Sequence, residues 1–127
     1  MKRGEIYLVN FGKKYNSEFG KVRPALIIQN DVANRNIDKV AFKGVTLMPM
    51  TTSITGGTVR VLINKRDKLE KDCELCVNEL CTLDQSRIRL DTLLTALTDD
   101  EMVELELKLR GHLGLCLVNG HKVVESV

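Results

Sequence analysis

Residues 20–30 read GKVRPALIIQN, an apolar run that follows a glycine and ends at an asparagine. The part from Val22 to Gln29 predicts a buried β-strand, because branched side chains dominate it and turn-forming residues flank it. Pro24 lies near its beginning, where a missing N–H does least harm. Arg23 is unusual in such a strand, since burying an unpaired charge is costly. We therefore expect Arg23 at the open end of the strand, as a fixed cation.

Further short segments on both sides of this strand indicate a mainly β protein. The predicted strands cover residues 5–11, 40–50, 58–63, 74–80 and, as a short one, 87–90. Residues 30–36 are expected to form a turn or a single helical turn. Strands that follow one another so closely leave no room for parallel crossovers. The sheet should therefore be mainly antiparallel and curled into a small barrel.

The pattern becomes helical near the end of the chain. Thr98 and Glu101 belong to a T-x-x-E capping box, and Met102, Leu105 and Leu109 follow at helical spacing. We predict a C-terminal helix over about residues 98–117, packed on the barrel or on a partner. With a length of 127 residues, the chain is expected to form a single domain, 1–127.

The composition is typical of an ordinary globular protein, with 43% hydrophobic and 28% charged residues. The first residues, MKRGEIY, lack the apolar core of a signal peptide, and no apolar run approaches the roughly 20 residues of a membrane helix. We expect a cytoplasmic protein that makes no use of a membrane. Basic residues outnumber acidic ones by six to two over residues 2–23, so a polyanion would favour this part.

The four cysteines include a C-x-x-C pair, Cys73 and Cys76, together with Cys81 and Cys116. In a strand, residues three apart point to opposite faces, so the pair cannot jointly bind zinc. A structural disulfide is of little use in the cytoplasm. We expect small buried or half-buried thiols, with an iron or zinc site built from all four cysteines as the open alternative. No metal and no cofactor are expected.

Many catalytic motifs are absent: the sequence has no Walker A loop, no G-x-G-x-x-G after a strand, no H-E-x-x-H and no G-x-S-x-G. His112 and His121 belong to the predicted helix end and the tail, so a two-histidine ribonuclease mechanism has little support.

Polar groups at strand ends remain as candidates. They are Glu18 and Arg23 around the first long loop, and Thr51, Thr52 and Ser53 after the third strand. Arginine and hydroxyl groups suit a phosphate, because both donate hydrogen bonds to its oxygens. RNA also supplies its own nucleophile, the 2′-OH, so no metal is required. The alternatives are that Arg23 pairs with Glu18 in a salt bridge and that the T-T-S run is a polar turn.

Five segments together resemble the MazF/PemK toxin family. They are KRGEIYLVNF (2–11), NSEFGKVRPALIIQND (16–31), MPMTT (48–52), TLDQSRI (82–88) and LTDDEM (97–102). The resemblance covers nearly the whole chain in the right order, and the second and third segments are specific in combination.

This resemblance implies a small SH3-like antiparallel barrel of the MazF/CcdB type with a C-terminal helix, working as a homodimer. It implies a metal-independent endoribonuclease that cuts single-stranded RNA at short sequences, leaving a 2′,3′-cyclic phosphate and a 5′-OH. It also implies a cognate MazE-like antitoxin that blocks the RNA groove. By position, Arg23 matches the family's catalytic arginine, Thr51 its catalytic threonine, and Glu18 an acidic position beside the site.

Residues of the first long loop combine charge with an aromatic ring, a pairing that binders of single-stranded RNA use. The predicted RNA-binding residues are Lys13, Lys14, Tyr15, Phe19, Lys21, Thr52 and Ser53. A solvated loop is an equally good interpretation of Lys13 and Lys14.

Two other functions fit the same barrel. Toxins resembling CcdB use it to bind DNA gyrase without nuclease activity, through an end that carries a tryptophan, and this chain has no tryptophan. A degenerate member that only binds RNA or its antitoxin is the second alternative.

Overall fold

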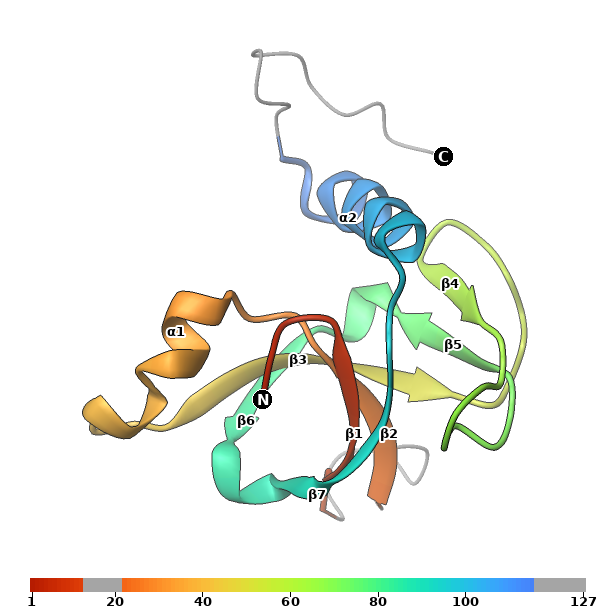
Figure 1. Cartoon of the computed structure of the whole chain (residues 1–127). Helices are drawn as coiled ribbons and strands as arrows, with labels where there is room; N and C mark the ends of the chain where they lie inside the picture. Colours follow the sequence, from red (N-terminus) through yellow and green to blue (C-terminus); the bar gives the residue numbers. More distant parts are fainter. Residues whose placement is uncertain (13–21, 116–127) are drawn as a thin grey trace.

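The structure is a computed structural model that describes residues 1–12 and 22–115. Over these residues, seven strands form one antiparallel sheet that curls around itself (Figure 1). The strands are β1 (Glu5–Asn10), β2 (Val22–Ile27), β3 (Gly44–Thr51), β4 (Arg60–Ile63), β5 (Cys73–Cys76), β6 (Cys81–Asp84) and β7 (Ile88–Ala96). Their order is β4-β5-β3-β2-β1-β7, and β6 pairs with the first half of β3. The sheet does not close, because β4 and β7 are its two ends.

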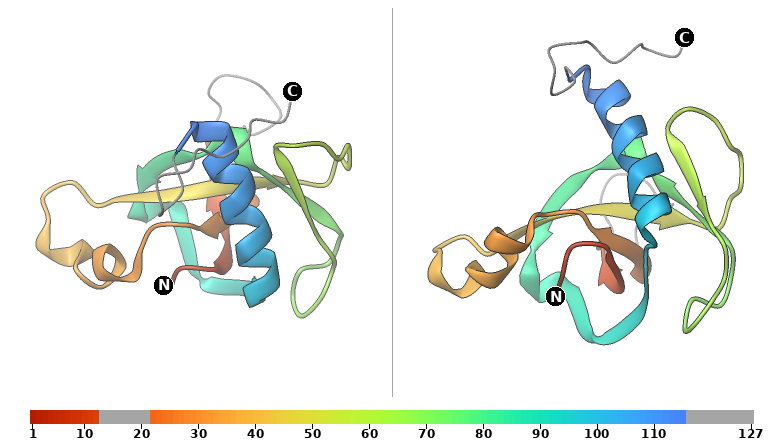
Figure 2. Two further views of the ribbon diagram at one scale, coloured as in Figure 1. Left: turned by 90° about the horizontal axis from the view of Figure 1, so that it is seen from above. Right: turned by 45° about the horizontal axis from the view of Figure 1, so that its top comes forward.

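Five helical segments connect or follow the described strands. They are α1 (Asp31–Arg35), the short 3₁₀ helices η1 (Ile37–Lys39), η2 (Val77–Glu79) and η3 (Gln85–Arg87), and α2 (Asp99–Leu113). The predicted capping box is present at the start of α2, where Thr98 and Glu101 bond each other's backbone. The helix lies across one side of the curled sheet, against η2 and β4 (Figure 2).

The mainly β architecture with a C-terminal helix is confirmed, and several predicted boundaries are wrong. The helix ends at Leu113 instead of residue 117, because Gly114 adopts a left-handed conformation with φ of 68° that ends it. The predicted strand 74–80 stops at Cys76, where the Val77 amide bonds the Val59 carbonyl and η2 begins. β6 was not predicted. β7 is longer than the predicted 87–90, because it pairs with β1 along most of its length despite its polar residues.

Residues of the central strands alternate between two apolar clusters. One lies between the sheet and α2 and includes Ile6, Leu26, Met48, Met50, Leu75 and Leu105. The other lies on the opposite face and includes Tyr7, Val9, Ala25, Ile27, Leu47 and Ile88. Both faces of β2 are therefore buried, which is why its sequence reads as a continuous apolar run instead of an alternating one.

Among the described residues, no helix combines the length and the apolar character needed to cross a membrane.

Candidate active site

The ends of β2 and β3 bring the predicted residues Arg23 and Thr51 together, and β5 adds an acid that was not predicted. The β2–β3 register pairs Ala25 with Pro49, and extending it by two residues sets Arg23 opposite Thr51. On the other side of β3, Thr51 pairs with Glu74 of β5. Cross-strand neighbours share a face of the sheet. Arg23, Thr51 and Glu74 therefore form one row across the sheet, which we call the site row.

Arg23 lies second in β2 and is half-buried. It stands next to the end of the strand, as the cost of a buried charge predicts. Its position on the same face as Ala25 directs it to the face of the second apolar cluster, at the edge of that cluster.

Thr51 is the last residue of β3 and is more buried than a strand-end residue would be expected to be. Thr51 is 3% exposed, and its Oγ1 accepts a hydrogen bond from the Ser53 amide at 3.1 Å. Within the described part of the chain, the Thr51 hydroxyl donates no hydrogen bond of its own. Thr52 and Ser53 are exposed. A ligand that approaches this end of β3 therefore meets Thr52 and Ser53 before Thr51.

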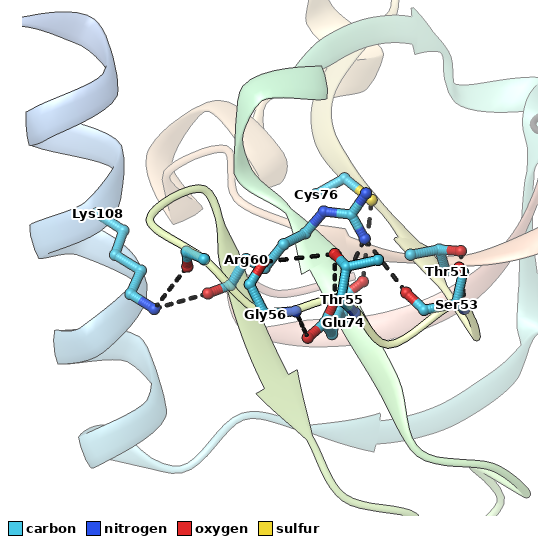
Figure 3. Close-up of polar contacts among 9 residues, drawn as sticks. Thr51, Ser53, Thr55, Gly56, Arg60, Glu74, Cys76 and Lys108 are labelled. Atoms are coloured by element: carbon cyan, nitrogen blue, oxygen red, sulfur yellow. Dashed lines mark hydrogen bonds and ion pairs between the residues drawn. The ribbon is translucent and has the colours of Figure 1, made fainter. Parts of the chain in front are cut away.

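Glu74 is the third member of the site row, and its carboxylate is buried, with the residue 2% exposed. Its Oε1 accepts from the Thr55 amide and its Oε2 from the Gly56 amide, both at 2.9 Å (Figure 3). Arg60 adds an ion pair at 3.3 Å from Nη1 to Oε1. The carboxylate thus holds the loop formed by residues 52–59, which joins β3 to β4 and which we call the 52–59 loop.

The charge state of Glu74 follows from these contacts. Burial raises the pKa of the carboxyl, but the amides of Thr55 and Gly56 and the guanidinium of Arg60 outweigh it, so the pKa lies below its usual value. Glu74 is therefore ionised at neutral pH, with its negative charge compensated by the loop and by Arg60.

Two cations hold the rest of the 52–59 loop. Arg60 donates from Nη1 to the Ser53 carbonyl at 3.4 Å. Lys108 reaches across from α2 and donates from Nζ to the carbonyls of Gly57, at 3.4 Å, and Arg60, at 2.7 Å (Figure 3). The loop that follows Thr51 is thus bonded both to β5 and to the C-terminal helix.

A pocket of about 290 Å³ opens on the opposite face of the strand ends. Pro24, which alternates with Arg23 along β2, lines it, as does Thr52, which follows the end of β3. Its other lining residues are Leu8, Lys68, Leu69, Glu70, Lys71, Cys73 and Leu94. The pocket is mostly apolar with lysines among its lining residues, a combination that suits a flat ring attached to an anionic backbone.

Several predicted site residues lie outside the described residues. They are Glu18, proposed as catalytic, and Lys13, Lys14, Tyr15, Phe19 and Lys21, proposed as RNA-binding. The structure brings together Arg23, Thr51, Thr52 and Ser53 from the predicted set.

Glu74, Arg60 and Lys108 were missed by the sequence analysis. The sequence feature that could have identified this group is Glu74, a single acid inside the apolar strand sequence CELCV. Such an acid needs buried partners, and the glycine pair Gly56 and Gly57 marks the loop that supplies them. Both glycines have positive φ, 71° and 111°, which other residues rarely adopt.

The described cysteines are thiols that pack in or beside the core. Cys73 and Cys76 are buried, and their sulfurs donate to different carbonyls, those of Lys71 and Glu74. Burial raises the pKa of the Cys73 thiol, which makes it a poor nucleophile. Within residues 1–12 and 22–115, no three histidine, cysteine, aspartate or glutamate side chains gather as a metal site. Cys116 lies outside the described residues.

Comparison with known proteins gives consistent matches over nearly the whole chain. A family model described as PemK-like, MazF-like toxin of type II toxin-antitoxin system matches residues 2–113. The endoribonuclease MazF of Staphylococcus saprophyticus is 33% identical over 123 residues, which cover 96% of this chain and 98% of that protein.

Solved structures share the fold. An endoribonuclease in complex with its cognate antitoxin, from a mycobacterial species, superimposes with a TM-score of 0.70 at 22% identity, covering 92% of this chain and 98% of that one. MazF from Deinococcus radiodurans gives a TM-score of 0.70 at 23% identity, covering 91% and 97%.

Proposed function

We propose that this chain, which belongs to the PemK-like, MazF-like toxin family of type II toxin-antitoxin systems, is an endoribonuclease that cleaves single-stranded RNA without a metal ion. The observation that carries the proposal is the β2–β3 register, which, when extended by two residues, sets Arg23 opposite Thr51 on one face. A guanidinium beside a hydroxyl offers a phosphate both charge and a neutral hydrogen-bond donor.

The proposed reaction uses the nucleophile within the RNA. The 2′-oxygen attacks the adjacent phosphorus, its proton passes to a base, and the bond from phosphorus to the 5′-oxygen breaks. The leaving 5′-oxygen takes up a proton, so the products are a 2′,3′-cyclic phosphate and a 5′-OH. No metal is needed, because the protein only positions the nucleophile and stabilises the growing charge on the phosphate.

Each member of the site has a separate proposed role. Arg23 binds the non-bridging phosphate oxygens and stabilises their charge. It does not act as the base, because an arginine pKa above about 12 leaves almost none of it deprotonated. Thr51 donates a hydrogen bond to the same phosphate. Glu18 orients Arg23 or takes the 2′-OH proton.

RNA binding involves both loops beside the site. The exposed Thr52 and Ser53 supply donors, and Lys13, Lys14, Tyr15, Phe19 and Lys21 supply charge and aromatic rings. Thr52 also lines the 290 Å³ pocket on the opposite face of the strand ends, which is therefore a candidate position for a base of the bound RNA.

The proposed partners and setting follow from the same family. The mycobacterial relative of similar fold is seen with its cognate antitoxin. We propose that this chain likewise pairs with a MazE-like antitoxin, works as a homodimer and acts in the cytoplasm, where its RNA substrate is found. We also propose that residues 1–127 form one domain, since the sheet joins β1 to β7 and α2 packs on it.

One experiment tests the function. The purified protein is incubated with a long single-stranded RNA in EDTA, and the cut ends are mapped and their chemistry is determined. We expect discrete cuts that carry a 2′,3′-cyclic phosphate and a 5′-OH. Protein carrying Arg23→Ala, prepared in parallel, serves as the control for contaminating ribonucleases.

Two results would contradict the proposal. Intact RNA together with inhibition of DNA gyrase would favour the CcdB-like alternative, although the family match favours the nuclease. Intact RNA without gyrase inhibition would leave a member that only binds RNA or its antitoxin.

A further inference from the structure

We infer that Glu74 is a positioning residue for this reaction, whose carboxylate holds the 52–59 loop so that the Thr51 hydroxyl points at the phosphate bound by Arg23. The inference rests on the proposed function, since it assigns a role within that site. Four steps support it.

The first step is the burial of a charge beneath an exposed loop. Residues 52–58 are exposed, whereas Glu74, which binds them from below, is 2% exposed. An ion is buried at a high desolvation cost that only good partners repay. A loop that merely joined two strands at the surface would need no such ion, so the acid has a purpose beyond covering the core.

The second step is the location of the anchor. Thr51 and Glu74 are cross-strand neighbours, and the 52–59 loop leaves β3 directly after Thr51. Consecutive amides of Thr55 and Gly56 each bond one carboxylate oxygen, which fixes the loop in position and in rotation. The anchor therefore acts next to Thr51.

The third step is a continuous chain of bonds from Glu74 to the Thr51 hydroxyl. Glu74 pairs with Arg60, and Arg60 donates to the Ser53 carbonyl. The Ser53 amide in turn donates to Thr51 Oγ1 (Figure 3). A hydroxyl oxygen that accepts one hydrogen bond can direct its own hydrogen only into the remaining directions. The loop position thus decides where the Thr51 donor points.

The fourth step concerns the glycines of the loop. Gly56 and Gly57 adopt φ of 71° and 111°, and a Cβ at either position would meet no atom within 4 Å. A side chain would therefore fit at both positions, and it is the positive φ of the backbone that favours glycine there. That conformation is the one that turns the Gly56 amide to Glu74.

The test compares steady-state cleavage of RNA by wild-type protein, Glu74→Gln and a matched control, Glu101→Gln. Glutamine keeps the size of the side chain and removes the charge. Glu101 also pairs with an arginine, Arg66, but none of its partners belongs to the site row or the 52–59 loop. In Glu74→Gln we expect kcat to fall by about tenfold, because small misplacements of reacting groups slow a reaction by such factors. KM should stay nearly unchanged. In Glu101→Gln we expect kcat and KM of the folded protein to stay as in wild type.

A second measurement does not use RNA. Hydrogen exchange of the Thr55 and Gly56 amides, followed by NMR, should be at least about tenfold faster in Glu74→Gln than in wild type and unchanged in Glu101→Gln. If Glu74→Gln fails to fold, Gly57→Ala replaces it, because it disturbs the exposed loop and leaves the buried carboxylate in place. It should lower kcat in the same way.

Three results would overturn the inference. Faster exchange with wild-type kcat would mean that the anchor is only structural. A raised KM with unchanged kcat would assign Glu74 to RNA binding. Unchanged exchange would mean that Glu74 does not hold the loop. Failure of the proposed function itself is distinguishable, because the wild-type protein would then not cut RNA while the exchange measurement would still report on the anchor.

Discussion

Glu74 and Glu101 both hold a loop through an arginine, yet they differ in surroundings and in expected consequence. The Glu74 side chain is 3% exposed and combines Arg60 with two backbone amides. The Glu101 side chain is 20% exposed and takes both terminal nitrogens of Arg66, at 2.6 and 2.8 Å. Judged by distance alone, the Glu101 pair is the stronger ion pair.

The position of each acid matters more than the length of its ion pair. Glu101 lies in the first turn of α2, where it also completes the helix cap, so its bonds join the helix to the segment between β4 and β5. Glu74 lies beside Thr51, so its bonds decide the geometry of the site row. The first acid should affect stability alone, and the second should affect stability and catalysis.

The largest effect is expected from removing a group that is proposed to bind the phosphate. Arg23→Ala should lower kcat by roughly 10²–10³ or more, because it deletes the donor that we propose stabilises the transition state. Single-turnover cleavage of a defined RNA measures this loss. Arg66→Ala is the control, since it removes an equal charge outside the site row, and its folded fraction should cut at close to the wild-type rate. Wild-type cleavage by folded Arg23→Ala would remove this arginine from the mechanism.

The second effect concerns the two arginines that serve the acids. Arg60→Met should lower the free energy of unfolding by roughly 2 kcal/mol, because Glu74 keeps its buried charge and loses a charged donor. Arg66→Met should cost less, about 1 kcal/mol, since solvent reaches Glu101. Urea unfolding at neutral pH measures both. Equal losses would show that burial does not separate the two pairs.

The third effect is on the pH dependence of stability. Burial raises the pKa of Glu74, but its amide and arginine partners outweigh it, and the Arg66 hydrogen bond leads in lowering the pKa of Glu101. A carboxyl with a lowered pKa in the folded state stabilises the protein above its unfolded pKa of about 4.3, and this contribution is lost as the pH falls through the folded value. The free energy of unfolding should therefore fall on acidification below about pH 5.

Single variants show how much each of the two carboxyl groups contributes to this loss of stability at low pH. Glu74→Gln and Glu101→Gln should each show a flatter decline than wild type in urea unfolding between about pH 3 and pH 6, because each removes one coupled proton. If the free energy of unfolding of Glu74→Gln fell with pH as steeply as that of wild type, the Glu74 carboxyl of the wild-type protein would not be ionised in the folded state.

The same contrast explains what the sequence could predict. Local patterns were enough for the strand that carries Arg23 and for the capping box that contains Glu101, because the decisive residues lie within a few positions of one another. The partners of Glu74 lie 14 to 19 positions away, and they meet it only after β3, β4 and β5 have paired. The neighbouring positions of Arg23 and Thr51 likewise depend on the β2–β3 register. The family resemblance supplied that pair, and no short-range pattern could have supplied Glu74.

The smallest effect should come from Lys108, which holds the 52–59 loop from the helix side. Its Nζ bonds the carbonyls of Gly57 and Arg60 and pairs with Glu104 at 3.3 Å, and the side chain is 30% exposed. Lys108→Met keeps the apolar stem and removes the charge, so it should cost less than about 1 kcal/mol. Because Glu74 still holds the Thr55 and Gly56 amides, kcat should change by about twofold or less, well below the tenfold loss in Glu74→Gln. Cleavage assays and urea unfolding of the two variants, run side by side, measure the difference. A loss of kcat as large as that in Glu74→Gln would mean that α2, and not β5, sets the position of the loop. It would then be wrong that Glu74 of β5 affects catalysis while the contacts of α2 affect stability alone.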